Sequence, residues 1–553
     1  MPGLEEAFDR IGVSAEHHLE ASHAPGLALS VTDREDTLGV VVRGLADVAA
    51  RTPVRPTTRF QIGSISKSFA SLIVLQEEAA GRLPLDVSVN DLVPWLGLAE
   101  PFGTITLHHL MTHTAGLLVG TEDAPTGAGT LHRLRENPPT TAPGERFLYS
   151  NDGWKVVGAC LEEVTGTRVP ELLAERIVGP LGMTSTAGAI TEAEHLTTAI
   201  GYEPVFTDRP VQLRHPLMPA KRIVSDTADG SIVSDVLDMG AYARLLLARG
   251  DVPDGRGGRL VPEDMFERWV AQYVDDDEGG TYGYGFWQDE VDGVRWIGHS
   301  GGMVGYTAYL AVSPDEGLGV VICQNGSGGK RGLARTAFAQ VRAALTGDPL
   351  PDPWVPPAAT DVPAAAEFAG TYRGDDGRVL MLSAEDGGLR LEVGGIGVAL
   401  ERDPLEEDPG DVFVIPHDAL ERFPLAFGRD DHGAVVEAVH GATWFRGDRH
   451  AGDDGDDPAP PPEADRVVGL YRNDDPWSPA LRVLVRRGRL VVTWPYTGSD
   501  EGADAVLIPL EDGWFAAGSL RDPRRIRFLG EGAGGRAVVA EYNGGQWFRA
   551  AEA

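Results

Sequence analysis

The sequence predicts three domains: an α/β domain with an antiparallel sheet flanked by helices, followed by two small antiparallel β-barrels. Three observations support this fold class. Strand-like runs stand at both ends of a mostly helical first part, two proline-rich stretches divide the remainder, and the two segments between and after these stretches begin and end alike. We expect domains at residues 1–346, 367–450 and 464–553, with linkers at 347–366 and 451–463.

The first domain has hairpin patterns near both of its ends. Pairs of apolar and β-branched runs flank polar turns, at 26–30 and 37–43 near the start and at 307–312 and 319–323 near the end. A helical pattern covers 333–345. Strands at both ends of a segment with a helical middle predict one antiparallel sheet that is closed by the termini of the domain.

The two C-terminal segments are predicted to be copies of one unit. The first opens with Phe-Ala-Gly-Thr-Tyr-Arg at Phe368 and closes with Gly-Ala-Thr-Trp-Phe-Arg at Arg446. The second opens with Val-Val-Gly-Leu-Tyr-Arg at Val467 and closes with Gly-Gly-Gln-Trp-Phe-Arg at Arg549. Matching ends indicate a duplication, and the short alternating runs between them are typical of a small antiparallel barrel.

Composition limits the partners of the chain. The formal charge of −35 over 553 residues argues against a nucleic-acid partner, because like charges repel. The N-terminal residues have no basic start with an apolar stretch, and no apolar run approaches about 18 residues, so we expect no membrane segment and a cytoplasmic location. The two cysteines, Cys160 in a helical run and Cys323 in a strand run, are expected to be buried free thiols.

The pair Ser64 and Lys67 stands where a helix is predicted to start. Positions i and i+3 share one helix face, so the lysine amine would lie beside the serine hydroxyl, near unpaired backbone N–H groups. Lysine occurs only at 67, 155, 221 and 330, whereas arginine supplies most other positive charge. Arginine cannot release its proton and a buried lysine can. The spacing alone has little specificity, because Ser327 and Lys330 repeat it in a glycine-rich run that we interpret as a loop.

Two further motifs in the first domain can complete a site. Tyr149-Ser150-Asn151 leads into a predicted helix, and His299-Ser300-Gly301 precedes a predicted strand. Alone, the first would be an ordinary helix start and the second an ordinary core or loop histidine. His109 and His113 have the four-residue spacing of metal ligands, but no glutamate follows His109, so we expect no metal and no cofactor.

In this order and spacing, Ser64-x-x-Lys67, Tyr149-Ser150-Asn151 and His299-Ser300-Gly301 resemble the serine beta-lactamase and penicillin-binding-protein superfamily, in its class C-like branch of esterases and D-amino-acid peptidases (peptidase S12). Stretches at 110–117 and 180–184 are also family-like. The layout of a catalytic domain and two small lipocalin-like barrels is similar to that of the three-domain D-aminopeptidases. The resemblance implies a beta-lactamase-like first domain.

The chemistry of acyl transfer gives each motif a role. Ser64 would be the nucleophile, with Lys67 as free amine or Tyr149 as phenolate as its base, the two sharing one proton. The resemblance implies that the N–H groups of Ser64 and Gly302 form the oxyanion hole, and that Asn151 binds a substrate carbonyl or orients Lys67.

His299, Ser300 and Gly301 would bind substrate. His299 stands where penicillin-recognising relatives usually carry lysine, and a histidine meets a substrate carboxylate only when it is protonated. This difference favours peptidase or esterase substrates. An aminopeptidase must also neutralise a substrate ammonium, for which the acidic stretch with Asp500 and Glu501 in the second barrel is the expected group.

The sequence thus predicts a serine hydrolase for small molecules or short peptides, foremost a D-stereospecific aminopeptidase or amidase. The alternatives are an esterase, a beta-lactamase or D-Ala-D-Ala carboxypeptidase-like enzyme, an acyltransferase, and a non-catalytic ligand-binding protein. A homodimer is a possible assembly.

Overall fold

The computed structural model describes residues 2–120, 127–135, 137–253, 257–276, 280–407, 410–450, 458–494 and 504–551. Its contacts divide the chain into two units. The first unit holds residues 1–203 and 218–356, and the second holds residues 204–217 and 357–553. The second unit therefore contains both C-terminal barrels and a short segment from the middle of the first predicted domain.

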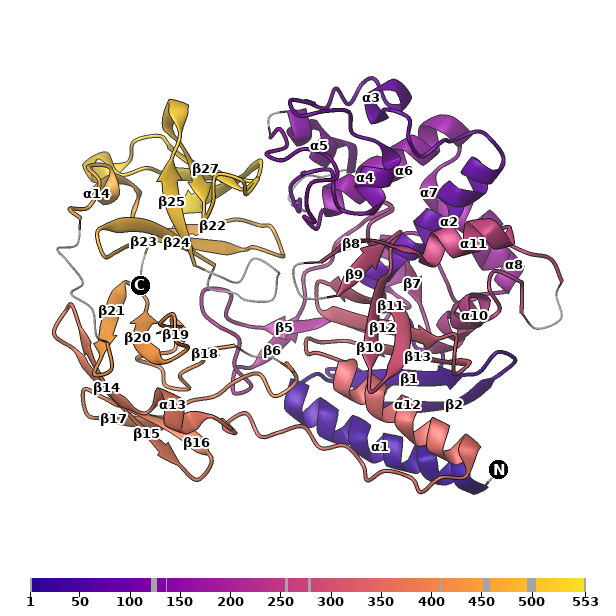
Figure 1. Cartoon of the computed structure of the whole chain (residues 1–553), viewed down its shortest axis with the longest axis horizontal. Helices are drawn as coiled ribbons and strands as arrows, with labels where there is room; N and C mark the ends of the chain where they lie inside the picture. Colours follow the sequence, from indigo (N-terminus) through magenta and orange to yellow (C-terminus); the bar gives the residue numbers. More distant parts are fainter. Residues whose placement is uncertain are drawn as a thin grey trace. The chain divides into compact units, whose positions relative to one another are not determined.

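An antiparallel sheet forms the centre of the first unit, with the order β3-β2-β1-β13-β12-β11-β10-β9-β8 (Figure 1). Its strands are β1 (Gly26–Thr32), β2 (Thr37–Asp47), β3 (Thr52–Pro53), β8 (Gln272–Asp275), β9 (Thr281–Gly283), β10 (Trp287–Val291), β11 (Val294–Met303), β12 (Tyr306–Ser313) and β13 (Leu318–Gln324). Strand β1 pairs with β13, with Leu29 opposite Ile322. Strands from the two ends of the domain thus close the sheet, which confirms the predicted fold class.

Helices cover both faces of this sheet. On one face α1 (Pro2–Ser22) and α12 (Arg331–Thr346) lie side by side (Figure 1), and Ile11 and Phe338 pack with Leu29 and Ile322. The opposite face carries the larger core, to which α2 (Ser66–Ala79), α6 (Asn151–Thr165) and α10 (Val236–Leu247) contribute. The remaining helices of the unit are short: α3 (Val89–Leu92), α4 (Leu107–Met111), α5 (Gly127–His132), α7 (Val169–Leu173), α8 (Gly179–Leu181), α9 (Glu192–His195) and α11 (Glu263–Val270).

Helix α2 is deeply buried in this core. Every residue from Ser66 to Leu75 is buried, including the polar ones. The helix ends at Ala79, and Gly81 follows with a left-handed φ of 72°. The predicted helix after Ser64 is therefore present, but it is surrounded by protein on all sides over these residues, which the amphipathic pattern did not indicate.

The start of the predicted first linker belongs to the first unit. The backbone N–H of Trp354 donates to Ser14 Oγ at 2.8 Å, and Arg10 Nη1 donates to the carbonyl of Leu350 at 2.9 Å. The Trp354 ring packs against the core beneath α1. Proline-rich residues up to Pro356 are thus bound along α1, and the passage to the second unit comes after them.

Each C-terminal segment forms an antiparallel β-barrel. The first contains β14 (Gly370–Gly374), β15 (Val379–Glu385), β16 (Gly388–Val393), β17 (Ile396–Ala399), β18 (Val412–Phe413), β19 (Leu425–Arg429), β20 (Val435–His440) and β21 (Thr443–Gly447), and a bridge between Glu401 and Val414 joins its two ends. The second is closed by β22 (Gly469–Arg472), β23 (Ala480–Arg486), β24 (Arg489–Thr493), β25 (Ala505–Pro509), β26 (Trp514–Ala517), β27 (Arg525–Leu529), β28 (Val539–Tyr542) and β29 (Gly545–Arg549).

The entry to each barrel repeats one hydrogen bond. Short helices α13 (Ala365–Phe368) and α14 (Ala464–Val467) precede the first strands. The hydroxyl of Tyr372 donates to the carbonyl of Phe368 at 2.9 Å, and the hydroxyl of Tyr471 donates to the carbonyl of Val467 at 2.7 Å. The two openings that match in sequence therefore match in structure.

The closing strands of the two barrels differ by one residue in register. The first turn, Gly441-Ala442, has its positive φ at the glycine, as in a type II′ turn, whereas Asn543 and Gly544 both have positive φ, as in type I′. The turn of the second copy begins one residue earlier than that of the first. Side chains at matching sequence positions of the two closing strands therefore point to opposite faces of the barrel wall. Phe445 is consequently buried in the first core, whereas its sequence counterpart Phe548 is 57% exposed.

Within the described part of the chain, every helix is too short or too polar to cross a bilayer. Cys160 in α6 and Cys323 in β13 are both buried and free, as predicted, and burial raises the pKa of each thiol to about 12.

Candidate active site

Ser64 lies in the turn η1 (Gly63–Ile65), directly before α2, and is partly exposed while its two neighbours are buried. The turn approaches the end of β11 closely. Gly63 has a φ of 54°, and a Cβ atom on it would lie 2.5 Å from the carbonyl oxygen of Gly302 and 2.7 Å from its nitrogen. Only glycine permits this approach, which brings the backbone of Ser64 beside the backbone of Gly302.

The side chain of Lys67 is fully buried, and its amine contacts acceptors from three parts of the chain. Its Nζ donates to Ser64 Oγ at 2.9 Å, to Asn151 Oδ1 at 2.8 Å and to the backbone carbonyl of Asp229 at 2.8 Å. These acceptors compensate the burial of an amine and fix its position. The three-residue spacing thus brings Lys67 onto Ser64, as the sequence predicts.

Tyr149 and Asn151 stand at the start of α6. Ser150 between them is the N-cap residue, and its Oγ accepts the backbone N–H of Gly153 at 2.9 Å, which fixes the first turn of the helix. The Nζ of Lys67 lies 5.0 Å from the centroid of the Tyr149 ring. The start of α6 and the start of α2 therefore meet at the amine of Lys67.

His113, which we did not assign to the site from the sequence, supports Tyr149. The two rings stack with centroids 4.2 Å apart. The backbone N–H of Ser150 donates to His113 Nδ1 at 2.8 Å, and Trp154 Nε1 faces His113 Nε2 at 3.2 Å. Burial, and then the charge of Lys67, lower the pKa of His113 well below its ordinary value. A neutral ring can accept one of these two N–H groups and a protonated ring can accept neither, so the neutral ring is favoured.

His299 is 4% exposed and lies between two tyrosines. Its Nδ1 contacts the carbonyl oxygen of Ser300, which can only accept, so Nδ1 carries the proton. The hydroxyl of Tyr282 then donates to Nε2 at 2.9 Å. Burial, and then Lys67, lower the pKa of His299 to about 3. The geometry thus favours a neutral histidine that supports the site over a cation that binds a substrate carboxylate.

The residues after His299 alternate along β11. Ser300 and Gly302 are exposed, whereas His299 and Gly301 are buried. A Cβ atom on Gly301 would collide with the carbonyl oxygen of Ile62, so this glycine also allows β11 to approach the turn that carries Ser64. The exposed face at Ser300 and Gly302 is the one available to a substrate.

A buried ion pair lies directly behind Asn151 on α6. Asp152 Oδ1 and Lys155 Nζ are 3.2 Å apart, and the two side chains are 4% and 2% exposed. Burial raises the pKa of Asp152 to about 6 even though Lys155 opposes this shift. Asp152 and Lys155 are three residues apart on one helix, a spacing at which opposite charges pair, whereas the burial of the pair depends on the surrounding fold.

The site expected from the sequence also includes Asp500 and Glu501. Asp500 and Glu501 fall within 495–503, outside the described residues. Lys330 Nζ donates to Thr307 and to the carbonyl of Gly328 at the start of α12, where it serves the structure of a loop, and Ser327 is exposed.

The two histidines directly before the family-like stretch at 110–117 have structural contacts. His109 Nδ1 accepts the backbone N–H of Thr106 at 3.2 Å and caps α4, whereas His108 Nδ1 contacts the Tyr284 hydroxyl at 2.8 Å. No group of three or more metal-binding side chains occurs in the part of the chain that the structure describes.

Known proteins are similar to this chain in sequence and in fold. The penicillin-binding protein 4 of Amycolatopsis lactamdurans is 28% identical over 388 residues, which cover 68% of this chain and 97% of that protein. The protein flp of Staphylococcus aureus is 23% identical over 58% of this chain, and the match spans 63% of the length of that protein, which is less than two thirds.

Solved structures agree with these matches. The penicillin-binding protein homologue from Pyrococcus abyssi is 25% identical and has a TM-score of 0.57, covering 79% of this chain and 99% of that one. The crystal structure of SurE is 23% identical and has a TM-score of 0.50. The match covers 80% of this chain and 100% of that one, and it supports the fold. The model of the Beta-lactamase family matches residues 14–344, more than half of the chain. The chain therefore belongs to the beta-lactamase family.

Proposed function

We propose that this protein is an acyl-serine hydrolase in which Ser64 attacks an amide or ester bond, and that its substrates are small peptides with an N-terminal D-residue or related amino-acid amides. The family to which the chain belongs consists of serine hydrolases. The observation that carries the assignment of the site is the 2.9 Å contact between the buried Lys67 Nζ and Ser64 Oγ.

In the proposed reaction the Ser64 hydroxyl attacks the substrate carbonyl carbon. Its proton passes to the pair formed by Lys67 and Tyr149, and from there to the leaving amine or alcohol. Water then attacks the acyl-enzyme by the same route in reverse. The negative oxygen of each tetrahedral intermediate is stabilised by the N–H groups of Ser64 and Gly302. The close approach of Gly63 to Gly302 supports this role.

The neutral state of His299 supports substrates without a carboxylate at this position. A carboxypeptidase or a penicillin-recognising enzyme benefits from a permanent cation beside the substrate carboxylate. His299 has a pKa of about 3 and does not supply one at neutral pH. Amino-acid amides, esters and peptides cleaved at their N-terminal residue do not need that cation.

A substrate with a free N-terminal amine also needs a negative partner. We propose that Asp500 and Glu501 supply it. An Asp500→Asn/Glu501→Gln double variant should lose its preference for substrates with a free amine over N-acetylated ones. An unchanged preference would remove these two residues from the proposal.

The deciding experiment is a paired panel of D- and L-amino-acid amides, esters, short peptides and a penicillin, measured by turnover. Ser64→Ala should abolish turnover, whereas Ser327→Ala, in the second Ser-x-x-Lys sequence, should leave it unchanged. Turnover of esters alone would make the protein an esterase, and product formation with an added amine would make it an acyltransferase. Failure of an activated-serine probe to label Ser64 would indicate a binding protein.

A further inference from the structure

The segment of residues 204–217 leaves the first unit and is part of the second. It connects β5 (Tyr202–Pro204) to β6 (Leu217–Pro219), which pair with each other. The backbone N–H of Val205 donates to the carbonyl of Pro216 at 3.0 Å. We call residues 204–217 the anchor segment.

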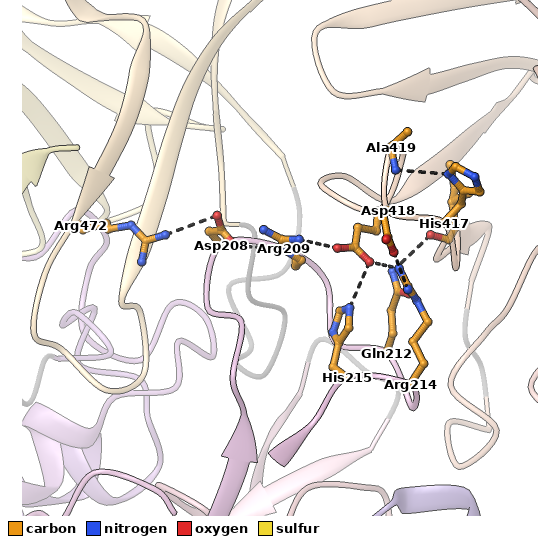
Figure 2. A network of polar contacts seen from close by, with 11 residues as sticks. Asp208, Arg209, Gln212, Arg214, His215, His417, Asp418, Ala419 and Arg472 are labelled. Carbon is orange, nitrogen blue, oxygen red and sulfur yellow. Dashed lines mark hydrogen bonds and ion pairs between the residues drawn. The ribbon is translucent and has the colours of Figure 1, made fainter. Parts of the chain in front are cut away.

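The anchor segment is bound to one carboxylate of the first barrel. Glu421 is buried, and its two oxygens contact Arg209, Arg214 and His215, whose side chains converge in Figure 2. Arg214 also pairs with Asp418 at 2.8 Å. Burial, and then the two arginines, lower the pKa of His215, so the ring is neutral and donates from Nε2 to Glu421 at 3.3 Å. Glu421 thus joins two guanidinium groups, each of which also has a second carboxylate partner.

The same segment also contacts the second barrel. Asp208 lies 2.9 Å from Arg209 Nε within the segment and 3.3 Å from Arg472 Nη2 at the end of β22 (Figure 2). The amide of Gln212 donates to the carbonyl of Ile415 at 3.3 Å. Contacts to both barrels fix the conformation of the anchor segment within the second unit.

Strands β5 and β6, which flank the anchor segment, contact the turn between β11 and β12 of the central sheet. The backbone N–H of Tyr202 donates to the carbonyl of Gly305 at 3.2 Å, and the Glu203 carboxylate accepts a hydrogen bond from the Gly305 backbone. Gly305 has a φ of 80°, and a Cβ atom on it would lie 2.5 Å from the Cβ of Ala220, just after β6. The turn between β11 and β12 is thus enclosed by the β5–β6 pair.

This turn follows directly on the proposed oxyanion strand. Gly302 and Gly305 are three residues apart, and Met303 lies between them with its Sδ close to Gly230. Gly230 follows Asp229, whose carbonyl accepts the amine of Lys67. A shift of the Gly305 turn would therefore move Gly302 and disturb the acceptor of Lys67.

We propose that Glu421 is a positioning residue of the catalytic site: by fixing the anchor segment, it holds the β5–β6 pair on the Gly305 turn and so keeps the Gly302 N–H in place for the oxyanion. In this proposal Glu421 does not contact the substrate. It acts on the catalytic site through the anchor segment. This role rests on the proposed function wherever the labelling of Ser64 is measured.

The test compares Glu421→Gln with Asp411→Asn, a matched change in the first barrel. Asp411 pairs with Arg429 at 2.6 Å and has no part in the anchor segment. For each full-length variant, hydrogen exchange is measured over peptides spanning 201–204 and 300–306, together with the rate at which a fluorophosphonate probe labels Ser64. Glu421→Gln should raise exchange in both peptides and slow labelling by about 2- to 30-fold. Asp411→Asn should change neither.

The two readouts separate this inference from the function. Failure to label wild-type Ser64 would contradict the proposed function, while exchange at 300–306 would still test the positioning role. Unchanged exchange and labelling in a folded Glu421→Gln variant would overturn the inference, as would equal effects of Asp411→Asn. If Glu421→Gln does not fold, Asp208→Asn replaces it, because this variant breaks the contact with Arg472. Asp208→Asn should give the same changes to a smaller degree. Exchange and labelling equal to those of wild type would overturn the inference.

Discussion

The backbone of Gly63 lies so close to the backbone of Gly302 that a single added methyl group on Gly63 would come within 2.5 Å of the Gly302 oxygen. This contact joins the turn that carries the proposed nucleophile to the strand that carries the proposed oxyanion donor. The order and spacing of the motifs identified the residues of the proposed site. The close approach of the two backbones depends, in addition, on glycine in both stretches at the point of contact.

Gly63→Ala should therefore lower kcat/KM by about 100-fold, because a displacement of about 1 Å at a reacting centre has an effect of this size. Gly293→Ala is the matched control. Gly293 also has a positive φ, 75°, and precedes the same strand, but a Cβ atom on it meets nothing within 4 Å. It should show only the cost of a left-handed alanine, about 1–2 kcal/mol of stability. Similar kcat/KM for the two variants would contradict the importance of the close approach.

Replacing Lys67 distinguishes a base from a fixed positive charge. Lys67→Met removes both functions, and Lys67→Arg keeps the charge but cannot give up a proton. If Lys67 takes part in proton transfer, both variants should lose about 10²- to 10⁴-fold in kcat. Steady-state kinetics with Tyr149→Phe alongside measures the second member of the pair. Near-wild-type turnover of Lys67→Arg would leave proton transfer to Tyr149 alone.

His299 should make the first unit less stable as the pH falls. Its pKa is about 3 in the folded chain and ordinarily 6.5, so the unfolded chain binds the proton first. The stability that depends on neutral His299 is complete above pH 6.5 and is lost below it, by about 1.4 kcal/mol per pH unit.

The non-titrating variant His299→Gln should reduce this slope by the same amount. Denaturant unfolding at pH 7.5, 6.0 and 5.5, followed by tryptophan fluorescence, measures the difference from wild type. Because His299 does not titrate near neutral pH in the folded chain, the acid limb of the kcat/KM profile should not move in the variant. A shifted acid limb would mean that His299 changes charge during turnover.

His113 offers a test of how Tyr149 is held. His113→Asn retains an acceptor for the Ser150 N–H and tolerates the φ of 56° at this position, but it loses the ring that stacks on Tyr149. His113→Phe retains the ring and leaves the N–H without its acceptor, at a cost of about 1–3 kcal/mol of stability.

We accordingly expect a lower kcat with little change in KM for His113→Asn, and a lower melting temperature for His113→Phe. Steady-state kinetics and thermal unfolding on both variants separate the two roles. Full activity of His113→Asn would show that Tyr149 does not depend on the stack.

The candidate site was predictable where chemistry depends on short-range spacing. Ser64 and Lys67 are three residues apart at one helix start, so their local geometry follows from helix periodicity. The partners of these groups were not predictable. The Asp229 contact uses a backbone carbonyl, which every residue has, and the charge state of His299 depends on burial and on Tyr282.

The barrels show the same division. The duplicated ends predicted two similar units, and the hydrogen bonds of Tyr372 and Tyr471 repeat accordingly. The one-residue difference between their closing turns reverses the exposure of Phe445 and Phe548.

Periodicity, composition and local spacing in the sequence were enough to predict the order of the domains, the sheet closed by its termini, the duplication and the residues of the proposed site. Only the tertiary structure decided that residues 204–217 belong to the barrel unit, that residues up to Pro356 pack along α1, and that His299 is neutral. Each of these depends on contacts between residues far apart in the chain, whose burial and charge no local pattern encodes.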